Sequence, residues 1–198
     1  VANDPDFALG QGAGFYVNAT QKPWAPHFRM WDYVTEELPR LLFNAFPLAE
    51  EAQAITGHSM GGHGALTIAM SFPGRFASVS AFAPICNPTA SDWGRPQLTA
   101  YLGPDESTWA AHDASLLMRR RGFDGPMLID QGTADQFLDK LRPETLAEAP
   151  LRMKFRGDRA LLPFDSRKTA DTRARFTFTA APGLEALEFT AFGRKPEG

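Results

Sequence analysis

The stretch Gly57-His58-Ser59-Met60-Gly61-Gly62 is the part of the sequence that decides the fold. It follows a short apolar run, residues 52–56, and precedes a stretch of small and apolar residues, 61–70. Gly-x-Ser-x-Gly between a strand and a helix is typical of a sharp turn that raises a serine hydroxyl above a parallel sheet. Glycines are expected there because side chains would collide with the neighbouring strand and helix. The pattern predicts Ser59 as a nucleophile; a purely structural glycine-rich turn is the alternative.

The residue after the serine has a second predicted role. If a helix starts beneath Ser59, the backbone N–H of Met60 lies at the positive end of that helix. An N–H in this place points to where negative charge develops on a carbonyl oxygen under attack. Met60 is therefore a candidate backbone donor of an oxyanion hole.

The sequence around this turn alternates between strand and helix patterns. Strands are predicted over residues 52–56, 76–82 and 126–130, and helices over residues 27–46, 61–70 and 136–149. The first helix is expected to bend at Pro39, and its apolar face comprises Phe28, Trp31, Val34, Leu38, Leu41, Leu42 and Ala45. This order predicts an α/β fold, a mostly parallel sheet flanked by helices. Residues 87–113 are expected to form a loop that leaves the sheet and shapes a pocket.

Two aspartates follow the last predicted strand. In serine hydrolases of this architecture the acid comes after the nucleophile in the chain, and the histidine comes last. Asp135 lies beyond the turn at Gly132, from where it can reach toward the carboxyl edge of the sheet. We predict Asp135 as the acid, with Asp130, still in the strand end, as the second choice.

Composition narrows the function classes. The chain has 198 residues, a net charge of −3 and one cysteine, Cys86. The length fits one domain with a real core, and the small charge gives no reason to expect a nucleic-acid partner. No apolar run is long enough to span a bilayer, and no signal peptide or metal-binding motif is visible. A single cysteine fits a reducing, cytoplasmic setting.

The charge changes sign near residue 150. Residues 1–150 carry 10 Lys or Arg and 17 Asp or Glu, whereas residues 151–198 carry 10 and 6. We therefore predict a hydrolase core over residues 1–150 and a divergent basic tail over residues 151–198. The tail is expected to be solvated or disordered, or to result from a disrupted reading frame. Its interspersed acidic residues argue against nucleic-acid binding.

Several separate blocks resemble the S-formylglutathione hydrolases, also called esterase D, a family of α/β-hydrolases. The blocks are residues 12–20, 33–39, 57–66 and 80–88, Trp93-Gly94, residues 101–103 and residues 128–138. The resemblance covers about residues 4–149. It implies hydrolysis of the small-molecule thioester S-formylglutathione to formate and glutathione, a step of formaldehyde detoxification, and cleavage of short carboxylesters. It also implies a cytoplasmic enzyme that needs no cofactor or metal, and it leaves a homodimer open.

The resemblance assigns Ser59 as nucleophile, Asp135 as acid and Met60 as one oxyanion donor. Family members are longer at the N-terminus, so the chain is expected to be an N-terminally truncated form. They also carry the catalytic histidine in a Gly-Tyr-Asp-His-Ser stretch, and residues 150–198 contain no histidine. An inactive hydrolase-like remnant, or a carboxylesterase or feruloyl esterase of the same fold, is therefore the alternative.

The four histidines all precede Asp135 in the chain, and the catalytic histidine stays unassigned. His58 and His63 are expected to have packing or capping roles, and His27 and His112 are expected at the surface. Each keeps a small chance of acting as the base.

Overall fold

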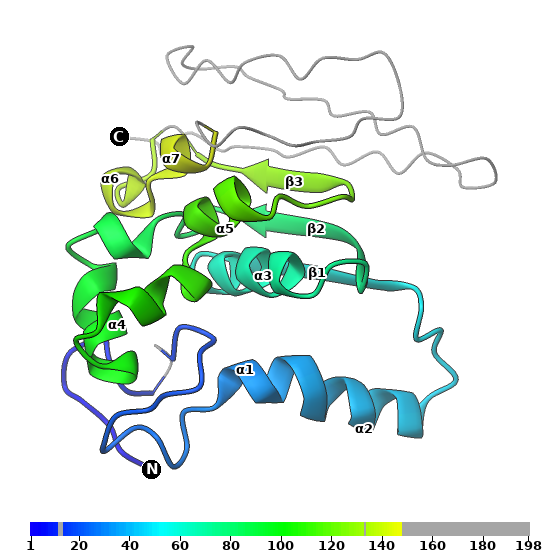
Figure 1. Ribbon diagram of the computed structural model, residues 1–198, viewed down its shortest axis with the longest axis horizontal. Coiled ribbons are helices and arrows are strands. Elements are labelled where there is room, and N and C mark those ends of the chain that lie inside the picture. Colours follow the sequence, from blue (N-terminus) through cyan, green and yellow to red (C-terminus); the bar gives the residue numbers. More distant parts are fainter. Residues whose placement is uncertain (12–13, 133, 148–198) are drawn as a thin grey trace, which may run out of the picture.

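The computed structural model describes residues 1–11, 14–132 and 134–147. Its centre is a three-stranded sheet of β1 (Gln53–His58), β2 (Phe76–Phe82) and β3 (Met127–Asp130), in the order β1-β2-β3. All neighbours are parallel, which confirms the predicted strands and the α/β architecture (Figure 1). His58 is in register with Phe82, and Phe82 with Asp130. The carboxyl ends of the three strands therefore meet at one edge of the sheet.

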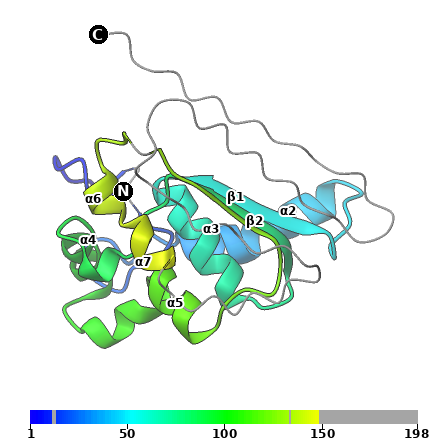
Figure 2. The ribbon, with the colours of Figure 1, turned by 90° about the horizontal axis from the view of Figure 1, so that it is seen from above.

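Helices surround this sheet. They are α1 (Met30–Asp32), α2 (Leu38–Ala45), α3 (Met60–Ser71), α4 (Gly94–Leu102), α5 (Ala114–Arg120), α6 (Leu138–Leu141) and α7 (Pro143–Ala147). A π-helical segment, Tyr33–Glu37, joins α1 to α2, and short 3-10 helices cover Pro88–Ala90 and Glu106–His112. Helices α3 and α5 lie together against the sheet, as the view from above shows (Figure 2).

The main core lies between α3, α5 and the sheet. Helix α3 is buried on all sides from Gly62 to Met70, which explains why its sequence is small and apolar rather than amphipathic. Its partners include Val79 and Ala81 of β2. Helix α5 begins at Asp113, a fully buried carboxylate that accepts the N–H of Leu116 as an N-cap.

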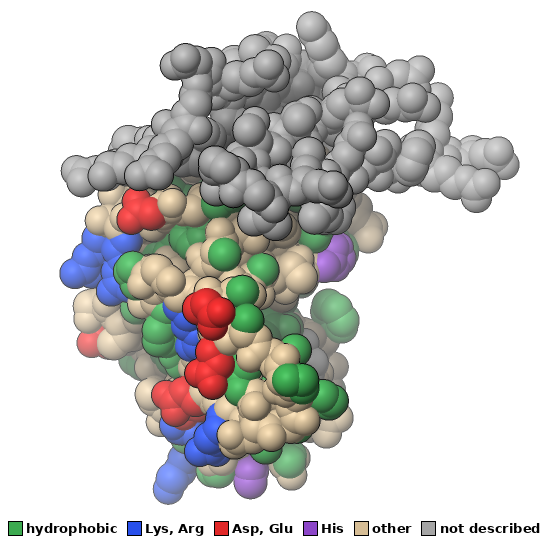
Figure 3. All heavy atoms as spheres, turned by 90° about the vertical axis from the view of Figure 1, so that its right-hand side faces the viewer, with side chains coloured by type: hydrophobic (Ala, Val, Ile, Leu, Met, Phe, Trp, Pro, Cys, Tyr) green, Lys and Arg blue, Asp and Glu red, His purple; other side chains and the backbone are tan. Residues whose placement is uncertain are grey.

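The first predicted helix is confirmed in extent but not in shape. Helical structure runs from Met30 to Ala45, and the change to π register occurs in the turn before Pro39, where proline removes a backbone donor. The expected apolar face packs through its first half, where Phe28 is buried and Trp31 and Val34 lie against the core. Apolar side chains reach the surface on the side where α2 lies (Figure 3); those of α2 and the residues after it are Leu41, Leu42, Phe46 and Leu48.

Two other expectations were wrong in detail. Residues 87–113 are not an irregular loop, because they form α4 and two 3-10 helices. The predicted helix over residues 136–149 is two short helices, α6 and α7. Arg142, with φ +55°, and Pro143 interrupt the helical pattern between them. The tail predicted over residues 151–198 lies outside the described residues. Within the described part, no helix has the length and apolar character needed to cross a membrane.

Candidate active site

Ser59 occupies a strained turn between β1 and α3. Its backbone has φ +54° and ψ −118°, a conformation that costs a non-glycine residue free energy and persists only where neighbours enforce it. Two hydrogen bonds do so. The N–H of Ser59 donates to the carbonyl of Phe82 over 2.8 Å, and the N–H of His63 donates to the carbonyl of Ser59 over 3.0 Å. The predicted sharp turn is confirmed.

The two glycines that flank Ser59 have different reasons to be glycine. A Cβ on Gly57 would lie 2.1 Å from the carbonyl oxygen of Gly61, a backbone atom that cannot move aside. A Cβ on Gly61 would meet only the hydroxyl of Tyr16, at 3.5 Å, an ordinary contact. The predicted collision therefore holds for Gly57 and not for Gly61.

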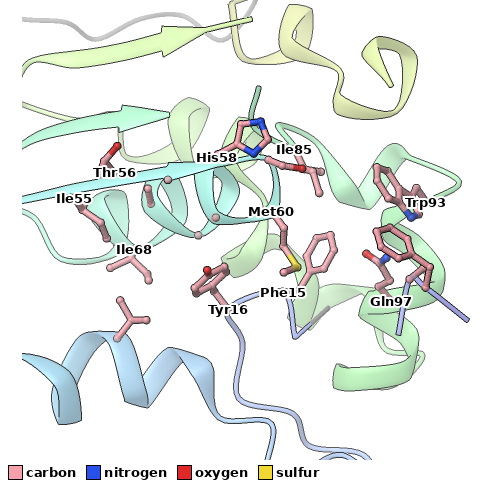
Figure 4. A pocket seen from close by; sticks show the side chains of 18 residues that line it. Phe15, Tyr16, Ile55, Thr56, His58, Met60, Ile68, Ile85, Trp93 and Gln97 are labelled. Carbon is pink, nitrogen blue, oxygen red and sulfur yellow. The ribbon is translucent and has the colours of Figure 1, made fainter. Parts of the chain in front are cut away.

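Ser59 and Met60 line a pocket of about 570 Å³. Met60 is the first residue of α3, and the N–H groups of a first helical turn have no acceptor within the helix. This is the placement that the sequence predicted for an oxyanion donor. The walls are mostly apolar, and Figure 4 shows Phe15, Tyr16 and Ile85 around Met60.

Sequence reasoning missed the part of the pocket wall made by Phe15 and Tyr16. Phe15 and Tyr16 both have positive φ, +54° and +50°, and both line the pocket. Ala83, directly after β2, also has a positive φ, +44°. Bulky residues carry no sequence signal for positive φ, so only their place in a block shared with a family could have drawn attention to them.

The two candidate acids lie close in sequence but are held differently. Asp130 ends β3, and its backbone carbonyl accepts the N–H of Ala83 over 2.7 Å. Asp135 lies in the following turn, where its carboxylate accepts the N–H of Phe137 over 2.8 Å and the side-chain amide of Gln131 over 3.1 Å. The side chain of Asp135 is thus oriented by two donors at the carboxyl edge of the sheet.

Two histidines, His63 and His112, pack inside the protein, the first fully buried and the second half-buried. His63 has no exposed surface, and its Nδ1 is 2.9 Å from the carbonyl oxygen of Ile85. Burial lowers the pKa of His63, and burial together with His63 lowers the pKa of His112 to about 4. His112 is half-buried and packs edge-on against Trp31, so it is less exposed than expected. The packing role expected for His63 is confirmed.

The catalytic base is not visible among these contacts. His27 is exposed, as expected. His58 is also exposed, at the rim of the pocket (Figure 4), so the packing or capping role expected for it was wrong. Within residues 1–11, 14–132 and 134–147, no histidine side chain forms a hydrogen bond with Ser59 or Asp135. The same residues contain no group of three side chains placed to hold a metal ion. Cys86 is fully buried, and burial raises the pKa of its thiol, so it is no rival nucleophile.

Residues 1–163 match the family model Esterase. The S-formylglutathione hydrolase of Paracoccus denitrificans is 68% identical over 149 residues, which are 75% of this chain and 53% of that protein. The S-formylglutathione hydrolase of Mus musculus is 51% identical over 149 residues, 74% of this chain and 53% of that protein. The chain therefore spans about half the length of the curated relatives it matches.

Solved structures agree with this match. An S-formylglutathione hydrolase from Agrobacterium tumefaciens superposes with a TM-score of 0.71 at 48% identity, covering 75% of this chain and 57% of that one. The Staphylococcus aureus fluorophosphonate-binding serine hydrolase FphF superposes with a TM-score of 0.52 at 20% identity, covering 71% and 58%. The second likeness concerns the fold alone, and with the first it confirms the α/β-hydrolase architecture.

Proposed function

The chain belongs to the Esterase family. On this premise we propose that it is the part of a serine hydrolase that contains the nucleophile, and that this hydrolase acts on S-formylglutathione or a close thioester. The observation that carries the proposal is the strained Ser59, at the carboxyl edge of a parallel sheet and inside a pocket. Backbone strain of this kind is retained at functional sites because neighbouring structure enforces it. The high identity to S-formylglutathione hydrolases supports the choice of substrate class.

The proposed chemistry has two steps. The Ser59 hydroxyl adds to the thioester carbonyl, and the developing oxyanion accepts the N–H of Met60. Collapse of this intermediate breaks the C–S bond, so the thiolate leaves and the acyl group stays on Ser59 as an ester. Water then attacks this ester and releases formate and the serine hydroxyl. A thiol with a pKa near ~8.5 leaves more readily than an alcohol, so protonation of the leaving group matters less.

Asp135 is the proposed acid of the triad. Its two hydrogen bonds, from Phe137 and Gln131, fix the orientation of its carboxylate without placing it in the core. An acid in this role orients an imidazole and stabilises its charged form. His63 and His112 do not fit the base, because burial lowers the pKa of both imidazoles and neither residue lines the pocket.

The same proposal extends to the setting of the protein. We propose residues 1–150 as the catalytic core and residues 151–198 as an appended tail. A small-molecule thioester or ester is the substrate, no cofactor takes part, and the compartment is the cytoplasm, where the buried Cys86 stays reduced. Self-association into a homodimer is a further part of the proposal, and sedimentation velocity of the purified chain tests it.

The test compares two proteins. One is the 198-residue chain. The other, called the hybrid below, carries residues 1–147 of this chain inside the remaining half of the Paracoccus denitrificans relative. Hydrolysis of S-formylglutathione is followed beside that of a short aryl ester, with Ser59→Ala in both proteins. We expect the hybrid to hydrolyse the thioester in a Ser59-dependent way. A hybrid that folds but shows no such activity would contradict the proposal.

A further inference from the structure

The pocket around Ser59 has two chemically different ends. Ile55 and Ile68 line one end, and Trp93 and Gln97 line the other, with Met60 and Phe15 between them (Figure 4). Pockets that bind small molecules are mostly apolar and use a few polar groups to fix the ligand's orientation. Gln97 is the polar side chain at its end, and the mechanism proposed above makes no use of it.

Gln97 stands in a position that would ordinarily be apolar. Helix α4 buries four residues, Gly94, Gln97, Leu98 and Tyr101, in the spacing of one helical face. Leu98 and Tyr101 are fully buried, and Gln97 is only 2% exposed. A polar residue on the buried face of a helix departs from the usual apolar pattern, and departures of this kind concentrate at functional sites.

The side-chain oxygen of Gln97 has no hydrogen-bond donor among the described residues. Burying an amide oxygen without a partner costs free energy, and native proteins contain few such atoms. His63 Nε2 and Gln131 Oε1 are the two comparable atoms in the same part of the chain, and neither residue lines the pocket. Gln97 alone of the three is placed where a ligand can supply the missing donor.

Helix α4 holds Gln97 firmly in this place. A Cβ on Gly94 would lie 2.5 Å from the backbone of Pro88, so the helix start is in close contact with the preceding 3-10 turn. At the other end, the Tyr101 ring packs on Trp24 and Phe28, and its hydroxyl accepts the N–H of Gly10. Gln97 therefore cannot reach solvent without displacing packed residues.

The lining of the pocket determines which donor fits. It contains no Asp, Glu, Lys or Arg among the described residues. An ammonium group placed there would be a buried charge without a counter-ion, which is strongly unfavourable. A neutral amide N–H satisfies the glutamine oxygen without that cost. A peptide-like leaving group offers such an N–H, and a simple alkyl ester does not.

We propose that Gln97 is a specificity-determining residue that accepts the N–H of a secondary amide in the thiol portion of the substrate. The inference rests on the proposed function and assigns to Gln97 the recognition of the peptide part of the substrate's thiol. Gln97 takes no part in bond breaking, so its effect is on binding. It is accordingly tested without turnover, on the 198-residue chain.

The test measures binding of S-methylglutathione, a thioether that Ser59 cannot cleave, by calorimetry. Two depsipeptide analogues, each with an ester oxygen in place of one amide N–H, serve as matched ligands. Replacing the recognised N–H weakens binding to the parent chain roughly 5- to 10-fold, the effect of one hydrogen bond. Gln97→Met weakens S-methylglutathione binding by a similar factor and has no further effect on the analogue that lacks that N–H. Gln53→Met, a change outside the pocket lining, leaves binding unaltered.

The outcomes separate the two proposals. Equal losses on all three ligands with Gln97→Met, or no loss, would overturn the inference while the proposed function stands. The ligand series on the parent chain decides the question even if the variant folds poorly, because it needs no substitution. Absence of S-methylglutathione binding by the parent chain would overturn the role of Gln97, whereas activity of the hybrid would still decide the proposed function. If binding depends on the amide but the hybrid is inactive, the role of Gln97 is supported and the hydrolase function is contradicted.

Discussion

The nucleophile and the proposed acid are held in contrasting ways. Ser59 is fixed by backbone: its strained turn is hydrogen-bonded to β2 on one side and α3 on the other, and Gly57 leaves no room for a Cβ. Asp135 is fixed by one side chain, Gln131, and by the N–H of Phe137 in its own turn. Damage at the first region should therefore appear as loss of the fold. Damage at the second should appear as loss of turnover in a folded protein.

The largest expected effect comes from supplying a base to the fixed nucleophile. No imidazole among the described residues is hydrogen-bonded to Ser59 or Asp135, so the 198-residue chain should hydrolyse S-formylglutathione far more slowly than the hybrid. Loss of the base from a serine triad costs about 10⁶-fold in turnover. The measurement is the steady-state rate of both proteins at about pH 7.5, where an imidazole is largely unprotonated and can act as a base. A brisk Ser59-dependent rate from the chain alone would direct the search for a base to His27, His63 and His112.

The next effect distinguishes the two acids. In the hybrid, Asp135→Asn should lower kcat by about 10⁴-fold, because an amide no longer selects the imidazole tautomer that the base needs. Asp130→Asn is the matched control and should lower it far less, since the backbone carbonyl of Asp130 makes the bond to Ala83. Circular dichroism should find both variants folded. The opposite ranking of the two kcat values would move the acid to the end of β3.

A third prediction concerns substitutions of the two glycines in the turn at Ser59. Gly57→Ala places a Cβ 2.1 Å from a backbone oxygen and should cost about 3 kcal/mol or more of unfolding free energy. Gly61→Ala, which meets only the Tyr16 hydroxyl, should stay within about 1 kcal/mol of the parent. Urea denaturation of the two variants gives the comparison. Similar midpoints would show that the turn is less constrained than its geometry implies.

The smallest expected effect concerns His112, which is neutral in the folded protein. The pKa of His112 is lowered to about 4, so the unfolded chain, with a pKa near ~6.5, binds the proton first as pH falls. Stability contributed by neutral His112 is therefore present above pH ~6.5 and is lost progressively down to pH ~4. Between pH 7 and pH 5 the unfolding free energy should drop by about 2 kcal/mol from this group.

The matched variant is His112→Phe, which keeps a ring against Trp31 and has no proton to bind. Between pH 7 and pH 5, the unfolding free energy of this variant should fall by about 2 kcal/mol less than that of the parent chain. The buried His63 contributes a loss of the same sign in both proteins. An unchanged pH dependence in the variant would show that His112 is solvated in the folded state.

Local sequence pattern was sufficient for the sheet and for the sharp turn that carries Ser59. Residues 76–82 and 126–130 alternate or run apolar between turn residues, and the structure places β2 and β3 there. The turn at Ser59 was predictable because Gly57 is required by a backbone contact within a few residues. Pattern failed where tertiary contacts decide: the exposed half of α2, the break at Arg142, and the partial burial of His112 beside Trp31.

The pocket was only partly predictable for the same reason. Trp93 belonged to a recognisable block, but Phe15 and Tyr16 enter the wall through positive φ angles that large side chains do not signal. Gln97 gave no signal either, since a glutamine in a helix is ordinarily a solvent-facing residue. Its significance depends on the burial of α4, which follows from contacts with Pro88, Trp24 and Phe28.

The central claim is that Ser59 is the nucleophile, and covalent trapping tests it most directly. The hybrid is incubated with a fluorophosphonate probe, digested, and analysed by mass spectrometry beside its Ser59→Ala variant. The account predicts one adduct, on the peptide that contains Ser59, and none in the variant. An adduct of equal yield in Ser59→Ala, or on another residue of the folded hybrid, would contradict it.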